Sequence, residues 1–302
     1  MWDDIHFSAR DGVRLYARKY SGKSGKRALL CLPGLVGNCQ EFDVLAEALS
    51  GSNPSVSRTV YTIDCRGRGR SELGGGRDAP SLLAECEDVL ELMTLAGLQD
   101  AAVLGTGHGG QLALILALLR PSAVGALILN ESAPEFEPEG VVRQMGEIAA
   151  LPLPATWAEA ASLLKGLQGR RYPGLDDAQW LGLAKSRFRE VAGQPARSYH
   201  SAIAASHSFS RGHANRRSLW PQFAAMAQVP MLLLRAELSD MIGDPALARM
   251  RDLHPALEVA NVAGQGHPVL LRDPASIGLV AQFLSRNDRI DPRAETSLRA
   301  VA

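Results

Sequence analysis

The sequence predicts an α/β fold with a mostly parallel, doubly wound sheet of about eight strands. One observation is that short, fully apolar runs alternate with longer stretches of helical periodicity, which is typical of a sheet covered by helices on both faces. The other is that 302 residues with 46% hydrophobic composition are enough to bury one large core. We therefore expect one main domain that carries an insertion.

The strands are predicted in two groups. A leading hairpin is expected from the segments 4–8 and 13–20, because Asp11-Gly12 between them is a typical tight turn. The central strands are predicted from six apolar runs, at 28–32, 59–63, 101–104, 126–129, 231–234 and 258–262.

The alternation of strands and helices breaks between residues 132 and 228. Three helices are predicted inside this region, at 157–167, 178–191 and 196–206. The resulting domain prediction is a core at 1–132 and 229–285, a helical cap or lid at 133–228, and a polar C-terminal tail at 286–302.

Composition excludes several classes of function. Lys and Arg together number 32, as do Asp and Glu, so no overall charge favours nucleic acid or an anionic membrane. The four cysteines, at positions 31, 39, 65 and 86, form no Cys-x-x-Cys pair, and the N-terminus lacks the basic region of a signal peptide. We expect reduced thiols, a cytoplasmic location and a small-molecule ligand, with no cofactor, metal, nucleic acid or membrane partner. The oligomeric state is not indicated.

The most informative motif is Gly105-Thr106-Gly107-His108-Gly109-Gly110, which follows an apolar run and precedes an apolar helix. In the nucleophile elbow Gly-x-Ser-x-Gly, a serine stands between two glycines in this context. Here Gly107 occupies the serine position. The elbow holds its central residue in a strained conformation that costs a residue with a side chain about 1–3 kcal/mol, whereas glycine adopts it freely. The motif therefore predicts a stable turn without a covalent nucleophile.

Four further motifs accompany the elbow in a characteristic order, and the last two form a pair. They are Leu32-Pro33-Gly34-Leu35, Asp64-Cys65-Arg66-Gly67-Arg68-Gly69-Arg70-Ser71, and a pair formed by the run Met231 to Asp240 with Gly264-Gln265-Gly266-His267. With these motifs, nearly the whole chain resembles the α/β-hydrolase superfamily. The resemblance is to lid-containing members that hydrolyse esters, lactones or carbon–carbon bonds.

The resemblance implies a catalytic role for residues in the last third of the chain. Asp240 is expected to orient His267, and His267 is expected to act as the base next to Gly107. Asp244 is a rival for the acid, although its place before Pro245 also suits a helix start.

The resemblance also implies an oxyanion hole. Its donors are expected to be the backbone N–H groups of Leu35, next to Gly34, and of His108. The His108 ring either packs at the first helical turn or orients substrate and transfers protons. The arginines at positions 66, 68 and 70 either hold their own loop or bind an anionic substrate.

The predicted function is hydrolysis of a small carbonyl compound, either an ester, a lactone or a diketone-like carbon–carbon bond. Without the serine, the chain is either an inactivated variant or a non-covalent enzyme in which an Asp-His pair acts as general base. One alternative is a pseudoenzyme that binds its ligand without turnover. Another is a dinucleotide-binding oxidoreductase, because Gly105-x-Gly107-x-x-Gly110 with Glu131 downstream also fits the dinucleotide fingerprint.

Overall fold

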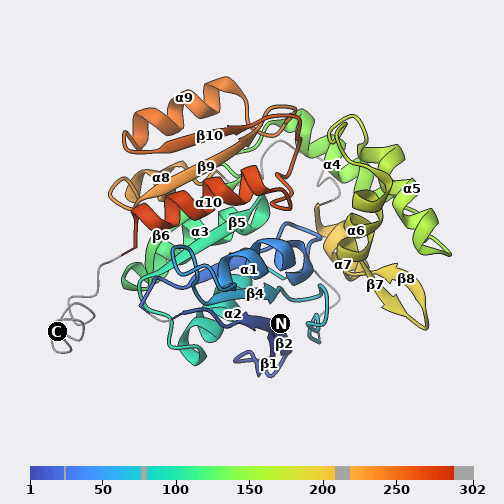
Figure 1. The fold of residues 1–302 in the computed structure, drawn as a ribbon, viewed down its shortest axis with the longest axis horizontal. Coiled ribbons are helices and arrows are strands. Elements are labelled where there is room, and N and C mark those ends of the chain that lie inside the picture. The colour runs from blue at the N-terminus through green and yellow to red at the C-terminus, as the bar shows by residue number, and fades with distance from the viewer. Residues whose placement is uncertain (24, 76–79, 208–217, 289–302) are drawn as a thin grey trace.

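The computed structural model describes residues 1–23, 25–75, 80–207 and 218–288, and its centre is an eight-stranded sheet (Figure 1). The strand order is β1-β2-β4-β3-β5-β6-β9-β10. Strand β2 runs antiparallel to β1 and β4, and the other neighbours are parallel. The strands are β1 (Asp3–Ser8), β2 (Arg14–Tyr20), β3 (Leu29–Leu32), β4 (Val60–Asp64), β5 (Ala101–Thr106), β6 (Val124–Asn130), β9 (Met231–Ala236) and β10 (Glu258–Val262). The predicted sheet is confirmed.

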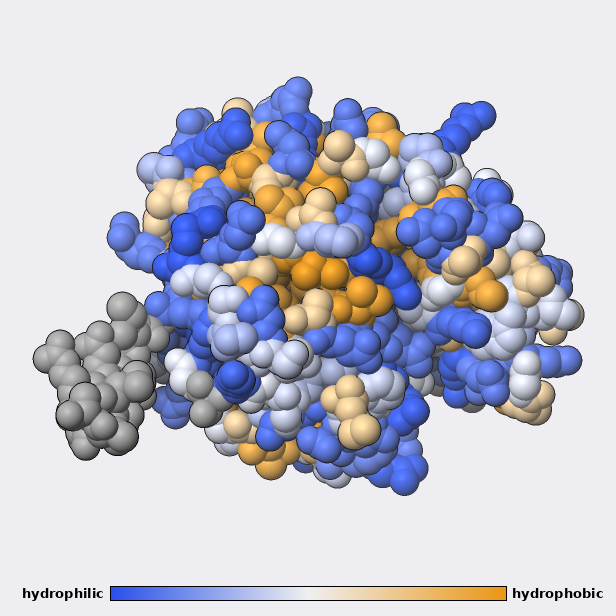
Figure 2. All heavy atoms as spheres, viewed as in Figure 1, coloured by the Kyte–Doolittle hydropathy of each residue, from blue (hydrophilic) through white to orange (hydrophobic). Residues whose placement is uncertain are grey.

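Helices cover both faces of this sheet. On one face lie α1 (Asp43–Ser50) and α10 (Pro274–Arg286), which Figure 1 shows in front of the strands. The other face is covered by α2 (Leu82–Leu95), α3 (His108–Leu119), α8 (Trp220–Ala225) and α9 (Asp244–Leu253). Short 3-10 helices are η1 (Cys39–Phe42) and η2 (Pro121–Ala123). Figure 2 shows hydrophobic residues gathered in the middle of the near face, where α1 and α10 lie in Figure 1.

A further group of elements lies to one side of the sheet in Figure 1. It consists of α4 (Pro138–Ala150), α5 (Trp157–Gln168), α6 (Asp177–Arg187), β7 (Phe188–Val191), β8 (Gln194–Arg197) and α7 (Ser201–His207). We refer to it as the 138–207 segment. It has its own apolar cluster, formed by Ala160, Leu164, Tyr172, Trp180, Leu183, Ala184, Phe188 and Leu270. The last of these residues comes from the loop between β10 and α10.

The predictions of helix at 178–191 and at 196–206 are wrong in part. Residues 188–191 and 194–197 form an antiparallel hairpin instead of helix. Ala192 and Gly193 between its strands have φ values of 50° and 80°, as a type I′ turn requires at both central positions. The predicted polar tail lies outside the described residues from position 289 onward, and α10 ends at Arg286.

The four cysteine side chains are free, as expected from the sequence, and all four are buried. Burial raises the pKa of the Cys86 thiol to about 12, which keeps this group protonated at neutral pH. Within the described ranges, no helix combines the length and the apolar composition needed to cross a membrane.

Candidate active site

The turn at Gly107 joins β5 to α3. Gly107 has φ 49° and ψ −110°, a conformation that side-chain-bearing residues rarely adopt. Helix and strand are also in close contact here, because a Cβ on Gly109 would lie 2.2 Å from the Leu32 carbonyl oxygen. The Gly107 carbonyl accepts a hydrogen bond from Ser132 Oγ at 2.7 Å. The motif thus forms the sharp strand–turn–helix connection that its glycines predict.

The His267 imidazole faces this turn. Its side chain is 5% exposed, and an ideal Cβ on Gly107 would lie 3.2 Å from its Cε1 and 3.4 Å from its Nε2. Hydrogen bonds from other elements help to hold the loop that carries it: Tyr172 Oη donates to the Pro268 carbonyl at 2.7 Å, and Asn130 Nδ2 donates to the Val269 carbonyl at 2.9 Å. The structure therefore brings His267 to Gly107, as the sequence predicts.

The carboxylate beside His267 belongs to Glu131, at the end of β6. Its Oε2 lies 3.4 Å from His267 Nδ1, and its side chain is fully buried. The Ala236 amide donates to Oε1 at 2.6 Å, and the Ser239 hydroxyl donates to Oε2. At 3.4 Å the imidazole contact is longer than an ordinary hydrogen bond, and Nδ1 has no hydrogen-bond partner in the described part of the chain. Such contacts in ligand-free sites commonly shorten when substrate binds.

The predicted pairing of Asp240 with His267 is wrong, because the Asp240 carboxylate has a different partner. The Asp240 carboxylate is bound by Arg143, whose Nη2 donates to Oδ1 at 2.6 Å, and no hydrogen bond or ion pair joins it to His267 among the described residues. Burial raises the pKa of Asp240, but the Arg143 guanidinium outweighs this effect and the net pKa is lowered. Asp244 starts α9, is exposed, and pairs with Arg235.

In the sequence, Glu131 stands out only as the acid downstream of a dinucleotide fingerprint. Its position at the sheet edge could have been predicted from the sequence, because Glu131 directly follows the apolar run of β6. Carboxyl ends of parallel strands meet at one edge of a sheet, where sites in such folds form. Since Glu131 is buried against His267, the observation that favoured a dinucleotide site no longer supports one.

A cavity of about 140 Å³ opens above the turn. Gly34, Leu35, Gly107, His108 and His267 are among its lining residues, so the predicted site residues other than Asp240 meet here. Apolar side chains complete much of the wall, namely Val36, Phe136, Val141, Met145 and Met241. The cavity therefore combines two histidine side chains, His108 and His267, with a largely apolar surface, as small-molecule sites do.

The His108 ring has a specific partner. Its Nε2 lies 2.7 Å from Oε2 of the buried Glu85. Burial raises the pKa of Glu85, but Arg68 and His108 outweigh it and the net pKa is lowered. Because the carboxylate is therefore ionised, Nε2 of His108 carries the hydrogen and donates it.

The three arginines of the loop after β4 hold that loop. Arg66 bonds both Asp11 and Asp88, and Arg68 bonds Glu85. Arg70 is half exposed and pairs with Asp4 at 3.2 Å. None of the three arginines lines the cavity at Gly107, which favours the structural alternative over substrate binding.

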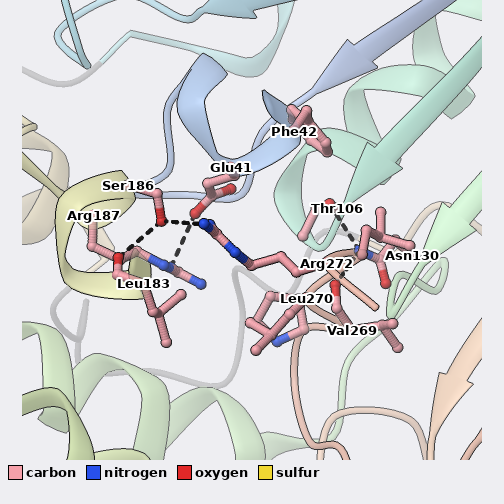
Figure 3. A pocket seen from close by; sticks show the side chains of 12 residues that line it. Glu41, Phe42, Thr106, Asn130, Leu183, Ser186, Arg187, Val269, Leu270 and Arg272 are labelled. Carbon is pink, nitrogen blue, oxygen red and sulfur yellow. Dashed lines mark hydrogen bonds and ion pairs between the residues drawn. The ribbon is translucent and has the colours of Figure 1, made fainter. Parts of the chain in front are cut away.

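Behind the His267 loop lies a smaller cavity, drawn in Figure 3. Arg272 extends across it and donates to Ser186 Oγ at 3.2 Å, while Asn130 donates to Thr106 Oγ1 on the other side at 3.1 Å. Its volume of about 20 Å³ accommodates about one water molecule. This cavity is too small for a substrate.

A third cavity, of about 80 Å³, lies toward the 138–207 segment. It shares Val36, Gln144, Arg187, His267 and Pro268 with the cavity at Gly107. The imidazole thus lies where the two spaces adjoin.

Comparison with known proteins agrees with this architecture. The model of the alpha/beta hydrolase fold family matches residues 27–274. The chain is 27% identical to a 3-hydroxybutyrate-oligomer hydrolase of Cupriavidus necator, over 90% of this chain and 93% of that protein. It is 25% identical to a Bacillus subtilis protein provisionally named 2-succinyl-6-hydroxy-2,4-cyclohexadiene-1-carboxylate synthase, over 93% and 98% respectively.

Among solved structures, an alpha/beta hydrolase from Novosphingobium aromaticivorans superposes with a TM-score of 0.85 at 32% identity, covering 94% of this chain and 98% of that one. The family match covers well over half of the residues, and the strand order and the turn at Gly107 fit it. The chain belongs to the alpha/beta hydrolase fold family.

Proposed function

We propose that this protein is a non-covalent hydrolase of a small carbonyl compound, either an ester or a carbon–carbon bond beside a carbonyl, with Gly107 at the position of the nucleophilic serine. The observation that carries the proposal is the contact between His267 and the bare backbone of Gly107, where a Cβ would already lie 3.4 Å from Nε2. A water molecule held over Gly107 is within reach of this nitrogen.

The reaction then uses the groups that line the cavity. Nε2 of His267 removes a proton from water, and the resulting hydroxide attacks the substrate carbonyl. The backbone N–H groups of Leu35 and His108 stabilise the oxyanion. Glu131 balances the charge of the imidazolium, as the acid of a catalytic triad does. Nε2 finally returns its proton to the leaving group, and both products depart without a covalent intermediate.

His267→Ala tests this mechanism directly. We expect the native chain to lose about 100-fold or more of its hydrolytic rate, the contribution of a positioned general base. The measurement is product release from a panel of p-nitrophenyl esters, lactones and β-diketones. His6→Ala, which removes an exposed histidine on β1, is the control. A rate that His267→Ala leaves unchanged contradicts the mechanism.

The pseudoenzyme is the second candidate, since a cavity of this size and lining suits a small ligand whether or not turnover follows. It gains support if the native chain binds members of the panel but converts none of them. It also requires that a serine introduced at position 107 fail to restore turnover.

The substrate is proposed to carry a carboxylate. Arg187 lines both larger cavities, and among the described residues its guanidinium forms one ion pair, with Glu41 at 3.1 Å. Its Nε is buried without a hydrogen-bond partner in that same part of the chain. A guanidinium with unused donors suits a carboxylate, and the names of the two relatives described above each include a carboxylate compound.

Arg187→Met tests the substrate class. We expect KM for a p-nitrophenyl ester with a terminal carboxylate to rise about 10-fold or more, because a hydrogen bond to a charged group is lost. KM for the uncharged ester of equal length is expected to change little. Steady-state kinetics of the two esters give the comparison, and an equal rise for both removes Arg187 from carboxylate recognition.

A further inference from the structure

A buried ion pair lies beneath the cavity at Gly107, formed by Arg68 of the loop after β4 and Glu85 of α2. Their side chains are 2% and 1% exposed. Neither group reaches the cavity lining, so neither has a part in the proposed reaction. Burying two charges is costly unless each makes further hydrogen bonds, so the other contacts of the pair are informative.

The two partners reach opposite sides of the oxyanion site. Arg68 Nε donates to the Leu35 carbonyl at 2.5 Å, and Glu85 Oε2 accepts from His108 Nε2 at 2.7 Å. Leu35 and His108 are the residues whose amides serve as oxyanion donors in the proposed function. A single pair of charges therefore bonds both of them, although they come from different segments of the chain.

We propose that the Arg68–Glu85 pair is a positioning device that fixes the spacing between the Leu35 and His108 amides. An oxyanion hole is effective only when its donors are held about 2.7–3.1 Å from the developing charge before the reaction. The planar guanidinium of Arg68 suits this role because its donors have fixed directions. It also donates from Nη1 to the Arg66 carbonyl at 2.9 Å, which anchors it to its own loop.

The neighbouring ion pair provides a matched comparison. Asp88 lies one turn further along α2 and is also buried, with 3% of its side chain exposed. The Asp88 carboxylate accepts a hydrogen bond from Arg66, which also donates a hydrogen bond to Asp11. Within the described part of the chain, Asp88 makes no hydrogen bond to Leu35 or His108. Loss of either pair costs stability, but only loss of the Arg68–Glu85 pair should loosen the two amides.

The test compares Glu85→Gln with Asp88→Asn in the full chain. We expect Glu85→Gln to lower the ¹⁵N order parameters of the Leu35 and His108 amides from about 0.85, typical of rigid backbone, toward about 0.6. Asp88→Asn should leave both values unchanged. Equal values in the two variants, or unchanged values in folded Glu85→Gln, overturn the proposal.

If Glu85→Gln does not fold, His108→Leu replaces it, because this change removes one contact and leaves the Arg68–Glu85 pair in place. The backbone amide of residue 108 should then become more mobile, while the Leu35 amide stays rigid. An unchanged order parameter for the amide of residue 108 contradicts the proposal.

The catalytic consequence rests on the proposed function and is measured separately. In a Gly107→Ser background, we expect Glu85→Gln to lower kcat about 100-fold, the effect of a misplacement of about 1 Å, with KM nearly unchanged. Asp88→Asn should keep the parent kcat, and an equal loss in both variants contradicts positioning. If Gly107→Ser is itself inactive, the expectation of a nucleophile position at Gly107 fails, and the order parameters still decide whether the ion pair positions the amides.

Discussion

Gly107→Ser is expected to convert this chain into an esterase whose rate on short p-nitrophenyl esters exceeds that of the native protein about 10³-fold. The reason is that a hydroxyl at this position meets a base already in place, since His267 Nε2 lies 3.4 Å from the Cβ site. In subtilisin, removal of the nucleophile costs about 10⁶ in kcat while other groups retain about 10³–10⁴ over water. Steady-state rates and a burst of p-nitrophenol, the signature of an acyl-enzyme, measure the effect.

Gly107→Ala is the matched control for this gain. Alanine introduces the same Cβ, which lies 3.2 Å from His267 Cε1, and the same positive φ of 49°. Both variants therefore push the imidazole by a few tenths of an ångström and lose about 1–3 kcal/mol of stability to backbone strain. Only the serine has a nucleophilic oxygen. If the two variants hydrolyse esters equally slowly, Gly107 does not stand at a nucleophile position.

Glu131→Gln is expected to abolish most of the activity gained by Gly107→Ser, with a loss of about 10⁴-fold in kcat. Replacing the triad aspartate by asparagine in a serine protease has this effect, because the wrong imidazole tautomer is stabilised. Here the Glu131 carboxylate, held by Ala236 N–H and by Ser239, faces His267 Nδ1. The measurement is kcat of the double variant relative to Gly107→Ser at one fixed pH.

Asp240→Asn in the same background should change kcat by only a few-fold. Its carboxylate pairs with Arg143 and is 40% exposed, and exposed ion pairs contribute little. A large loss of kcat with Asp240→Asn and a small loss with Glu131→Gln would instead identify Asp240 as the acid that orients His267.

Much of the fold could be predicted because the sheet is buried on both faces. Strands such as β5 and β6 consist almost entirely of apolar residues, and this signal is local. The turn at Gly107 and the histidine loop were also predictable, since glycines mark positions where backbone approaches backbone closely. His267 was found in this way, and the structure places it at the turn.

The choice of the acid could not be made from local sequence. Asp240 and Glu131 both follow apolar strands, and which carboxylate turns inward depends on the path of the loop after β9. In the structure, Ser239 donates to Glu131, whereas Asp240 points to Arg143 on α4. The bond to Arg143 joins residues 97 apart in the chain, so only the assembled fold decides between the two acids.

The hairpin of residues 188–197 was missed for a different reason. Phe188 and Val191 fit a helical pattern as well as a strand pattern, and short runs of this length are ambiguous. The turn residues Ala192-Gly193 were the better signal, because Gly at the second position is common in two-residue hairpin turns.

The loop that carries His267 is bonded to the 138–207 segment through Tyr172 and Pro268, and Leu270 packs into that segment's apolar cluster. Attempts to change substrate range by grafting this segment from a homologue would therefore also displace the imidazole. A successful chimera must import the β10–α10 loop together with the segment, because the two form a single transplantable unit.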